Sequence, residues 1–126
     1  MKKDGERYTI AVDFDGVIHS YTSPWVAAHV IPDPPVDGAI EWLMRMADQF
    51  DIVIFTTRGK TWRGRRAVLR WLHKKSFYLY DAEIKVTAKK PPCLIYLDDR
   101  AVRFEGPGTF PTADEIHRAR PWNKRR

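Results

Sequence analysis

Short apolar runs that stop abruptly at polar residues are the feature that most constrains the fold of this 126-residue chain. Tyr-Thr-Ile-Ala-Val at 8–12 leads directly into Asp-Phe-Asp-Gly, the run at 51–56 ends in threonine, and Leu-Ile-Tyr-Leu at 94–97 leads into two aspartates. Continuous apolar runs of this length are typical of strands that are buried on both faces of a parallel sheet. The sequence therefore predicts parallel strands whose carboxyl ends carry polar groups.

Helical periodicity occupies the segments between these runs. Apolar residues recur at helical spacing over 36–49, and the segment 61–75 carries its apolar residues on one side of a basic helix. We predict a further short strand over 83–86, a candidate fifth strand over 101–104, and a capping box at Thr112 that starts a final short helix. Strands that alternate with helices predict an α/β fold, a three-layer sandwich with a central parallel sheet of about five strands.

The length is that of one domain, which we place over residues 1–126. Its motif-bearing core is expected over about 8–117, followed by a basic tail over 118–126. No apolar run is long enough for a membrane span, and the first residues lack the apolar stretch of a signal peptide. The single cysteine, Cys93, excludes an intramolecular disulfide and is predicted to be a packed core thiol. We expect a soluble, cytoplasmic protein with no membrane partner.

The charge distribution favours an anionic partner. Lys and Arg number 22 against 16 Asp and Glu, so the formal net charge is +6. Residues 52–80 hold eight basic residues and no acid, and a second basic cluster lies at 118–126. Phosphate groups are the obvious candidates for such a surface, whereas a solvated helix face and a soluble tail are the alternative. Charge alone therefore selects no function.

Four carboxylates follow two of the predicted strands: Asp13, Asp15, Asp98 and Asp99. The carboxyl ends of parallel strands share one edge of a sheet, where ligands bind. Carboxylates brought together there repel one another unless a cation compensates them. Oxygen ligands favour Mg²⁺ over Zn²⁺, and the four histidines show no metal-ligand spacing. The pattern predicts a magnesium site which, with a threonine and a lysine beside it, suits phosphoryl transfer.

Four short motifs in this chain resemble those of the haloacid dehalogenase superfamily, whose phosphatases carry them in the same order. The first is an apolar strand followed by Asp-x-Asp, and the second is an apolar strand that ends in threonine or serine. The third is a lysine, and the fourth is an apolar strand that closes with paired aspartates. The matches are residues 13–17, residues 52–58, Lys90 before two prolines (with Lys89 as the fallback) and residues 94–99.

The resemblance implies a role for each matched residue. Asp13 would be the nucleophile that forms an aspartyl-phosphate, and Asp15 would protonate the leaving oxygen and then activate water. Thr56 and its neighbour Thr57 would hold the transferring phosphoryl group, while Lys90 would balance its charge. The dehalogenases of the superfamily lack the second aspartate, so Asp15 favours phosphate chemistry over carbon–halogen cleavage. The resemblance places Mg²⁺ on Asp13, the backbone carbonyl of Asp15, Asp98 and Asp99.

The gaps between the motifs are too short for the cap domains found in many members of this superfamily. Residues 17–35 and 77–89 are the segments where a cap would be inserted. We therefore expect a capless protein whose site is open to solvent unless a partner covers it. The candidate substrate contacts are Arg58 and Lys60, which could meet phosphates, and His19, Tyr21 and Trp25, which could stack on a base or simply pack within their loop.

These observations lead to one functional hypothesis and two alternatives. The hypothesis is a Mg²⁺-dependent phosphomonoester hydrolase that acts on nucleotides or nucleic-acid phosphate ends. One alternative is a small-metabolite phosphatase that closes its site by oligomerising. The other is a nucleic-acid-binding protein that keeps the fold but has weak or no catalysis. The sequence leaves the oligomeric state open.

Overall fold

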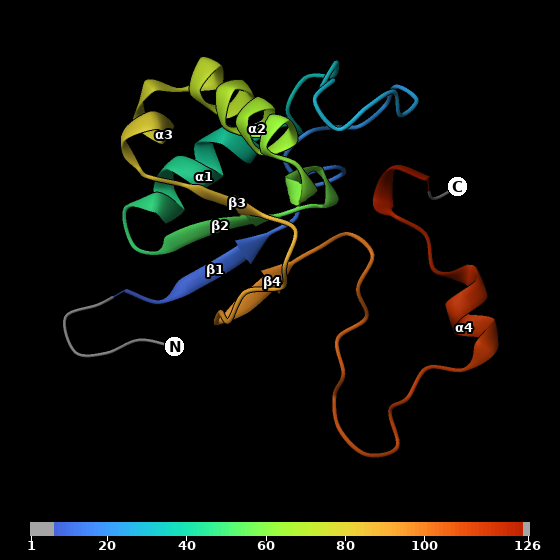
Figure 1. The fold of residues 1–126 in the computed structure, drawn as a ribbon. Coiled ribbons are helices and arrows are strands. Elements are labelled where there is room, and N and C mark those ends of the chain that lie inside the picture. Colours follow the sequence, from blue (N-terminus) through green and yellow to red (C-terminus); the bar gives the residue numbers. More distant parts are fainter. Residues whose placement is uncertain (1–6, 125–126) are drawn as a thin grey trace.

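A four-stranded parallel sheet forms the centre of the protein (Figure 1). The computed structural model describes residues 7–124. The strands lie in the order β3-β2-β1-β4, and every neighbouring pair is parallel, which confirms the predicted α/β class. They are β1 (Thr9–Val12), β2 (Asp51–Phe55), β3 (Lys85–Thr87) and β4 (Ile95–Leu97).

The pairing register aligns the carboxyl ends of the strands. Val12 of β1 pairs with both Ile54 of β2 and Leu97 of β4. The ladder continues one residue further, because the N–H of Asp13 donates to the Leu97 carbonyl at 2.8 Å. The residues that follow β1, β2 and β4 therefore emerge at one edge of the sheet.

Helices cover one face of this sheet (Figure 1). One helix connects β1 to β2, and three short or medium helices connect β2 to β3. Both connections step in the same direction across the sheet, so right-handed crossovers place their helices on the same side. The helices are α1 (Ala39–Ala47), the 3₁₀ turn η1 (Thr57–Lys60), α2 (Trp62–Lys75) and α3 (Phe77–Asp81).

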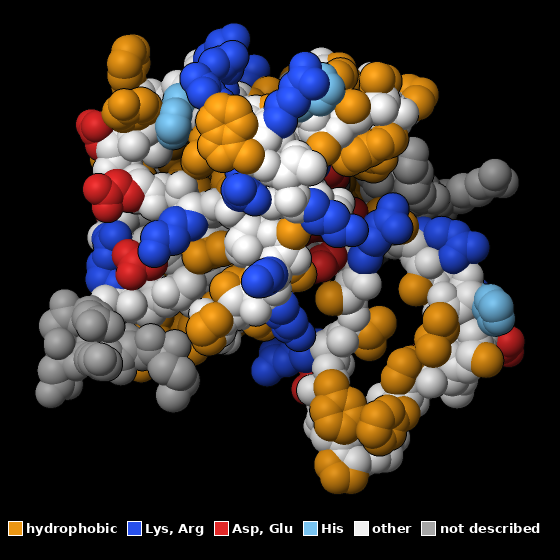
Figure 2. Space-filling view, viewed as in Figure 1, with side chains coloured by type: hydrophobic (Ala, Val, Ile, Leu, Met, Phe, Trp, Pro, Cys, Tyr) orange, Lys and Arg blue, Asp and Glu red, His pale blue; other side chains and the backbone are white. Residues whose placement is uncertain are grey.

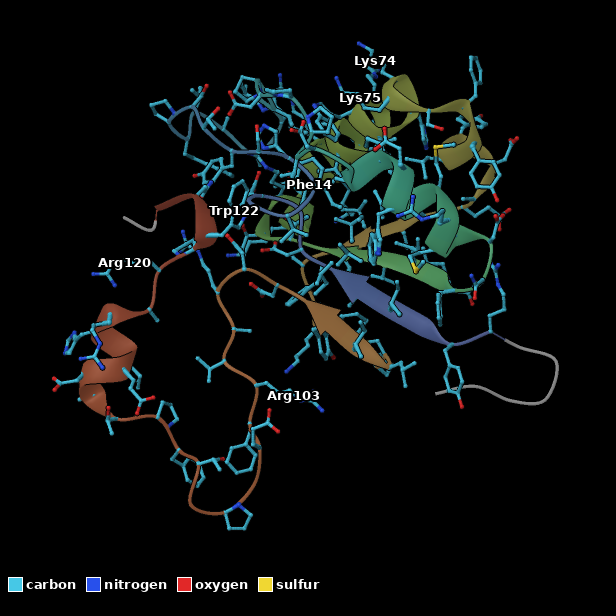
Figure 3. The ribbon with its side chains drawn as sticks, turned by 180° about the vertical axis from the view of Figure 1, so that it is seen from behind. Phe14, Lys74, Lys75, Arg103, Arg120 and Trp122 are labelled. Carbon is cyan, nitrogen blue, oxygen red and sulfur yellow. The ribbon has the colours of Figure 1, made fainter. Side chains whose placement is uncertain are left out.

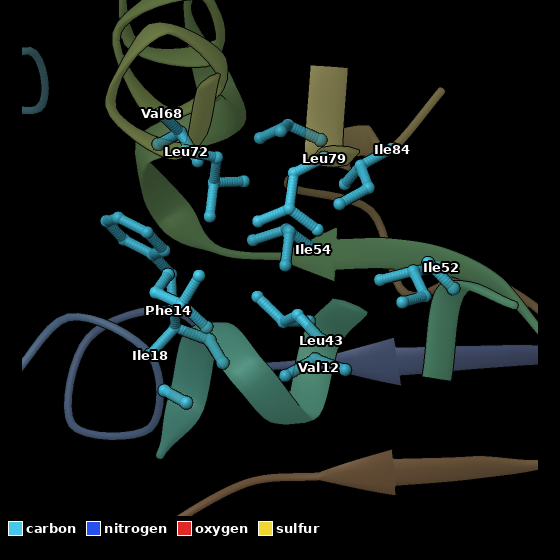
Figure 4. Close-up of a cluster of buried hydrophobic side chains, with 14 of the residues drawn as sticks. Val12, Phe14, Ile18, Leu43, Ile52, Ile54, Val68, Leu72, Leu79 and Ile84 are labelled. Carbon is cyan, nitrogen blue, oxygen red and sulfur yellow. The ribbon is translucent and has the colours of Figure 1, made fainter. Parts of the chain in front are cut away.

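The hydrophobic core lies between these helices and the sheet (Figure 4). Leu43 of α1, Leu72 of α2 and Leu79 of α3 are fully buried and converge on Ile54 near the end of β2. Burying each such side chain contributes roughly 1.5–3 kcal/mol. Helix α3 was not predicted, because it buries only Leu79 and so shows no helical periodicity.

The chain after β4 leaves the sheet as an extended segment, here called the C-terminal arm (residues 100–124) (Figures 1 and 2). The arm contains α4 (Ala113–Arg118), which begins at the predicted capping box. The fifth strand predicted over 101–104 does not form, and Val102 and Phe104 are 65% and 58% exposed. A short apolar segment becomes a strand only when a neighbouring strand pairs with it. The described sheet therefore has four strands rather than five.

The arm also changes the expected layering. Helix α4 stands beside the sheet in both opposite views, so the described residues form no second helical layer over the other sheet face (Figures 1 and 3). Strand β4 is consequently exposed along its length. Cys93, directly before it, is half-buried and its thiol donates to the Ile95 carbonyl, so the prediction of a packed core thiol is wrong. Among the described residues, no helix is long and apolar enough to span a membrane.

Candidate active site

A hollow of ≈ 380 Å³ lies at the carboxyl edge of the sheet. It is bounded by residues that follow β1, β2, β3 and β4, by the loop after β1 and by the end of the C-terminal arm. Its polar and aromatic lining includes Asp13, Asp15, Tyr21, Trp25, Thr56, Thr57, Asp98, Asp99 and Arg100.

A tight turn after β1 presents the first two aspartates. The Phe14 carbonyl accepts the N–H groups of Ile18 and His19, both at 2.9 Å, and the Phe14 N–H donates to an Asp13 carboxylate oxygen at 2.8 Å. The Phe14 ring is completely buried in the core. The buried ring and the backbone bonds hold Asp13 and Asp15 on either side of an anchored residue.

Three carboxylates meet in this hollow: Asp13, Asp98 and Asp99 each offer an oxygen within 4.8 Å of the others. The Oδ1 atom of Asp99 is buried and has no hydrogen-bond partner among the described residues. Gly16 makes this approach possible, since a Cβ there would lie 2.4 Å from Asp99 Oδ2 and the residue has φ +86°. Clustered carboxylates with an unsatisfied buried oxygen fit a hard cation such as Mg²⁺.

The raised pKa of Asp13 reflects the crowding of these carboxylates. Burial raises the pKa of the Asp13 carboxyl from 3.8 to about 7, and the neighbouring negative charge of Asp98 adds to the rise. Hydrogen bonding from the Phe14 N–H acts in the opposite direction but does not offset these effects. A bound cation reverses this balance, because it favours the ionised carboxylate.

This raised pKa predicts that metal-free protein loses stability as the pH rises. Between pH values of about 4 and about 7, the folded state binds a proton at Asp13 that the unfolded chain has already released. This extra proton contributes to the stability of the folded state. That contribution is fully present below the unfolded pKa and is lost as the pH rises through the folded pKa. We expect its loss to lower the free energy of unfolding by about 1 kcal/mol, after discounting for solvent screening. Urea unfolding in chelator across this range measures it, with Asp13→Asn as the comparison; an identical pH slope in the variant would contradict the assignment.

Asp15 has different neighbours from Asp13. Its carboxylate accepts the Arg58 Nε–H at 2.9 and 3.1 Å and lies 2.8 Å from His19 Nδ1. Burial opposes ionisation of Asp15, but the hydrogen bonds from His19 and Arg58 outweigh it and lower the pKa of this carboxyl. The structure therefore separates the two aspartates electrostatically: burial and like charge favour a proton on Asp13, and Asp15 is kept as a carboxylate.

His19 belongs to the interior rather than to the substrate surface. Its side chain is completely buried, and its ring stacks on Phe14 with centroids 5.5 Å apart. The Asp33 N–H donates to His19 Nε2 at 3.0 Å, so Nε2 accepts and Nδ1 is the ring nitrogen that faces Asp15. The structure gives no support to stacking of this ring on a substrate, because neither of its faces reaches solvent.

Arg58 is likewise buried, with 1% of its surface exposed. Besides its bonds to Asp15, Nη1 donates to the carbonyls of Ala27, Ala28 and Val30 at 2.9–3.1 Å. Its guanidinium carbon lies 4.4 Å from the centroid of the Trp25 ring. Arg58 therefore holds the loop after β1 against the carboxyl edge of the sheet, and the geometry does not support its expected contact with substrate phosphate.

The two threonines after β2, Thr56 and Thr57, both line the hollow. Thr56 is buried, and its N–H donates to the Thr87 carbonyl at 2.9 Å, which fixes it beside β3. Its hydroxyl oxygen accepts the Arg58 N–H at 3.2 Å, so the hydroxyl proton remains to be donated. Thr57 is exposed and also lines the hollow.

The structure does not bring the predicted lysines to the carboxylates. The Nζ of Lys90 lies 4.8 Å from the centroid of the Tyr96 ring, and Lys90, Lys89 and Lys60 are absent from the described lining of the hollow. Ala88 does line it, so Lys89 is the lysine next to a lining residue in the chain. The choice between Lys89 and Lys90 stays a prediction.

The end of the C-terminal arm contributes groups to the hollow that were not predicted from the sequence. The indole N–H of Trp122 donates to the Gly16 carbonyl, and the Asn123 side chain donates to the Ser20 carbonyl at 3.1 Å. Trp122 lies beside the turn that holds Phe14 (Figure 3). The available signal was one Pro-Trp-Asn triplet inside a basic stretch. Residues 125 and 126 of the predicted tail lie outside the described residues.

Comparison with known proteins adds no further assignment. No family model matches the chain, and neither a curated protein nor a solved structure matches it. A functional assignment therefore depends on the chemistry of the residues gathered at this edge of the sheet.

Proposed function

We propose that this protein is a Mg²⁺-dependent phosphomonoester hydrolase that works through an aspartyl-phosphate on Asp13. The observation that carries the proposal is the meeting of Asp13, Asp98 and Asp99 in one open hollow, beside the Thr56 hydroxyl. Cations compensate such a cluster, and hydroxyl groups hold the equatorial oxygens of a phosphoryl group. The resemblance to the haloacid dehalogenase motifs supports the same chemistry.

The residues that would hold the metal are the three clustered aspartates, together with the backbone carbonyl of Asp15. When bound, Mg²⁺ supplies positive charge that orients the substrate phosphate and offsets its repulsion from the carboxylates. The unsatisfied Oδ1 of Asp99 fits this assignment, because a buried carboxylate oxygen without a donor is otherwise costly.

The proposed reaction has two displacements at phosphorus. In the first, a carboxylate oxygen of Asp13 bonds to phosphorus while the bond from phosphorus to the leaving oxygen breaks. The leaving oxygen keeps that electron pair and takes up a proton. In the second, water attacks phosphorus, the bond to Asp13 breaks, and inorganic phosphate leaves with Asp13 restored as a carboxylate.

Asp15 suits the second displacement better than the first. Its lowered pKa keeps it ionised and thus able to accept a proton from the attacking water. The resemblance also implies that Asp15 protonates the leaving oxygen, but the bonds from Arg58 and His19 oppose a proton there. We infer that the leaving oxygen draws its proton from solvent in the open hollow, which favours substrates with acidic leaving groups such as p-nitrophenol.

Phosphate release from a mixed panel tests the proposed function. The panel holds p-nitrophenyl phosphate, mononucleotides, phosphorylated oligonucleotides, sugar phosphates and a phosphopeptide, each assayed with Mg²⁺. We expect turnover that falls by roughly 100-fold or more in EDTA, because the carboxylate cluster loses its compensating charge, and that returns when Mg²⁺ is restored in excess.

Two outcomes of this panel would change the assignment. Undiminished turnover in EDTA would remove the metal from the proposal. No turnover on any substrate, by protein shown to be folded by circular dichroism, would favour the binding protein without catalysis. A preference for sugar phosphates together with a stable oligomer would favour the small-metabolite phosphatase, whose open hollow a second subunit would cover.

A further inference from the structure

One face of α2 carries a row of positive charge outside the site described above. Arg63, Arg66, Arg70 and Lys74 follow one another at intervals of three or four residues and are all exposed. That spacing places them on one side of the helix. With a rise of 1.5 Å per residue, the row extends for about 17 Å. We call these four residues the basic row.

Acidic side chains do not neutralise the basic row. Residues 52–80 contain no aspartate or glutamate, and no ion pair within the described residues involves any of the four. Arg66 instead lies over the Trp62 ring, 5.1 Å from its centroid. Like charges at this spacing destabilise an isolated helix. The row is therefore a cost to the free protein that a bound polyanion would relieve.

The surface along the basic row is hollowed. A hollow of ≈ 340 Å³ lies between α2 and the loop after β1, where His29 and Ile31 face the row. A second hollow of ≈ 670 Å³ continues toward the end of α2, and both share Arg66, Arg70 and Lys74. Figure 2 shows Lys and Arg side chains gathered over α2 at the top of the molecule, and Figure 3 shows Lys74 projecting from its far end.

Exposed aromatic rings stand at both ends of the row. Trp62, at the start of α2, is 64% exposed. Phe77 and Tyr80 lie beyond its other end and are 90% and 62% exposed, and both line the second hollow. Aromatic rings beside a positively charged groove are the combination that binds single-stranded nucleic acids, because bases stack on the rings while cations meet the phosphates.

The loop after β1 links the basic row to the catalytic hollow. Trp25 lines the catalytic hollow and His29 lines the first basic one, and Arg58 holds the backbone between them through the carbonyls of Ala27 and Ala28. On the other side, η1 joins Thr57 to the start of α2. A nucleic-acid chain that lies along α2 would therefore have one end directed toward the hollow that contains Asp13.

We propose that the basic row binds the backbone of a single-stranded nucleic acid and directs its terminal phosphate into the catalytic hollow. This inference rests on the proposed hydrolase function and names its substrate class. A row of four cations over about 17 Å matches a ligand with several regularly spaced anionic groups. A mononucleotide or a singly phosphorylated peptide would leave most of the row unused.

Binding to an oligonucleotide without a terminal phosphate tests the basic row separately from catalysis. The probe is a fluorescein-labelled 12-residue oligothymidylate with hydroxyl ends, measured by anisotropy over a salt series. The test variant combines Arg66→Gln, Arg70→Gln and Lys74→Gln. The charge-matched control combines Arg45→Gln, Lys85→Gln and Arg103→Gln, three exposed residues that line neither basic hollow.

We expect the test variant to bind at least about 10-fold more weakly, with the slope of log K against log salt reduced by about 2. The control should stay within about two-fold of wild type, because its cations lie outside the row. Equal weakening in the two triple variants would overturn the proposal. Tighter binding of anionic lipid vesicles or of a phosphopeptide than of the oligonucleotide, at physiological salt, would overturn it as well.

Turnover by the same variants separates failure of this inference from failure of the proposed function. We expect the test variant to lose at least about 10-fold in kcat/KM on the 12-residue oligonucleotide with a terminal phosphate, and to keep p-nitrophenyl phosphate hydrolysis within about two-fold. Equal losses on both substrates would refute the basic row as a substrate track. Row-dependent binding without any turnover would refute the hydrolase and the delivery of a terminal phosphate, and leave only a nucleic-acid surface.

Discussion

Replacing Asp13 by asparagine is expected to reduce kcat for phosphate release by roughly 10³-fold or more. The amide is nearly the same shape as the carboxylate but cannot bond to phosphorus as a nucleophile, so the aspartyl-phosphate does not form. The measurement is steady-state release from p-nitrophenyl phosphate at saturating Mg²⁺. Rapid acid quenching with ³²P-labelled substrate should trap radiolabelled protein in wild type and none in Asp13→Asn.

The stability of Asp13→Asn provides a control for its folding. Because the Asp13 carboxyl is crowded by burial and by Asp98, asparagine should make metal-free protein more stable at neutral pH. Asp114→Asn, an exposed acid in α4, serves as the matched change and should leave both turnover and stability unaltered. Wild-type turnover by Asp13→Asn would refute Asp13 as the nucleophile, while a folded and more stable but inactive variant is the expected result.

Arg58→Met is expected to lower the free energy of unfolding by about 3–5 kcal/mol. Methionine keeps much of the buried volume but removes every donor of the guanidinium. The Asp15 carboxylate and three carbonyls of the loop after β1 then lose their shared partner while remaining partly buried. Urea unfolding of wild type and variant, followed by circular dichroism, measures the difference.

Two further substitutions make the Arg58 experiment specific. Arg58→Lys keeps the charge but lacks the planar fork that reaches Asp15 and the loop together, so it should recover only part of the lost stability. Arg63→Met removes an exposed arginine of α2 and should change stability by less than about 0.5 kcal/mol. A small effect of Arg58→Met, comparable with that of Arg63→Met, would mean that the loop is held by other contacts.

The strands and their polar ends were predictable because the signal is local. Each run combines high β propensity with an abrupt change to polar residues. Parallel pairing brings the carboxyl ends of the strands to one edge of the sheet, independently of the loop conformations. The positions of Asp13, Thr56 and Asp98 follow from that rule alone. The candidate site could therefore be located from periodicity before any contact was known.

The elements without such a signal were predicted less well. Helix α3 buries one residue and therefore leaves no periodic pattern. The segment 101–104 has the composition of a strand, but a strand forms only beside a neighbouring strand. This segment belongs to the C-terminal arm, which runs away from β4. Cys93 was expected in the core because it precedes an apolar strand, yet that strand lies at the exposed edge of the sheet.

The sequence by itself determined the fold class, the strand ends and the chemical types gathered at the carboxyl edge. Tertiary structure alone decided how the similar aspartates differ: Asp13 joins the acidic cluster, whereas Asp15 pairs with Arg58, 43 residues away. It also brought Trp122 to Gly16 across 106 residues and left Lys90 against Tyr96. The physical reason is that periodicity is set by near neighbours, whereas pKa values and ion pairs depend on which distant groups the packed chain brings within a few ångströms.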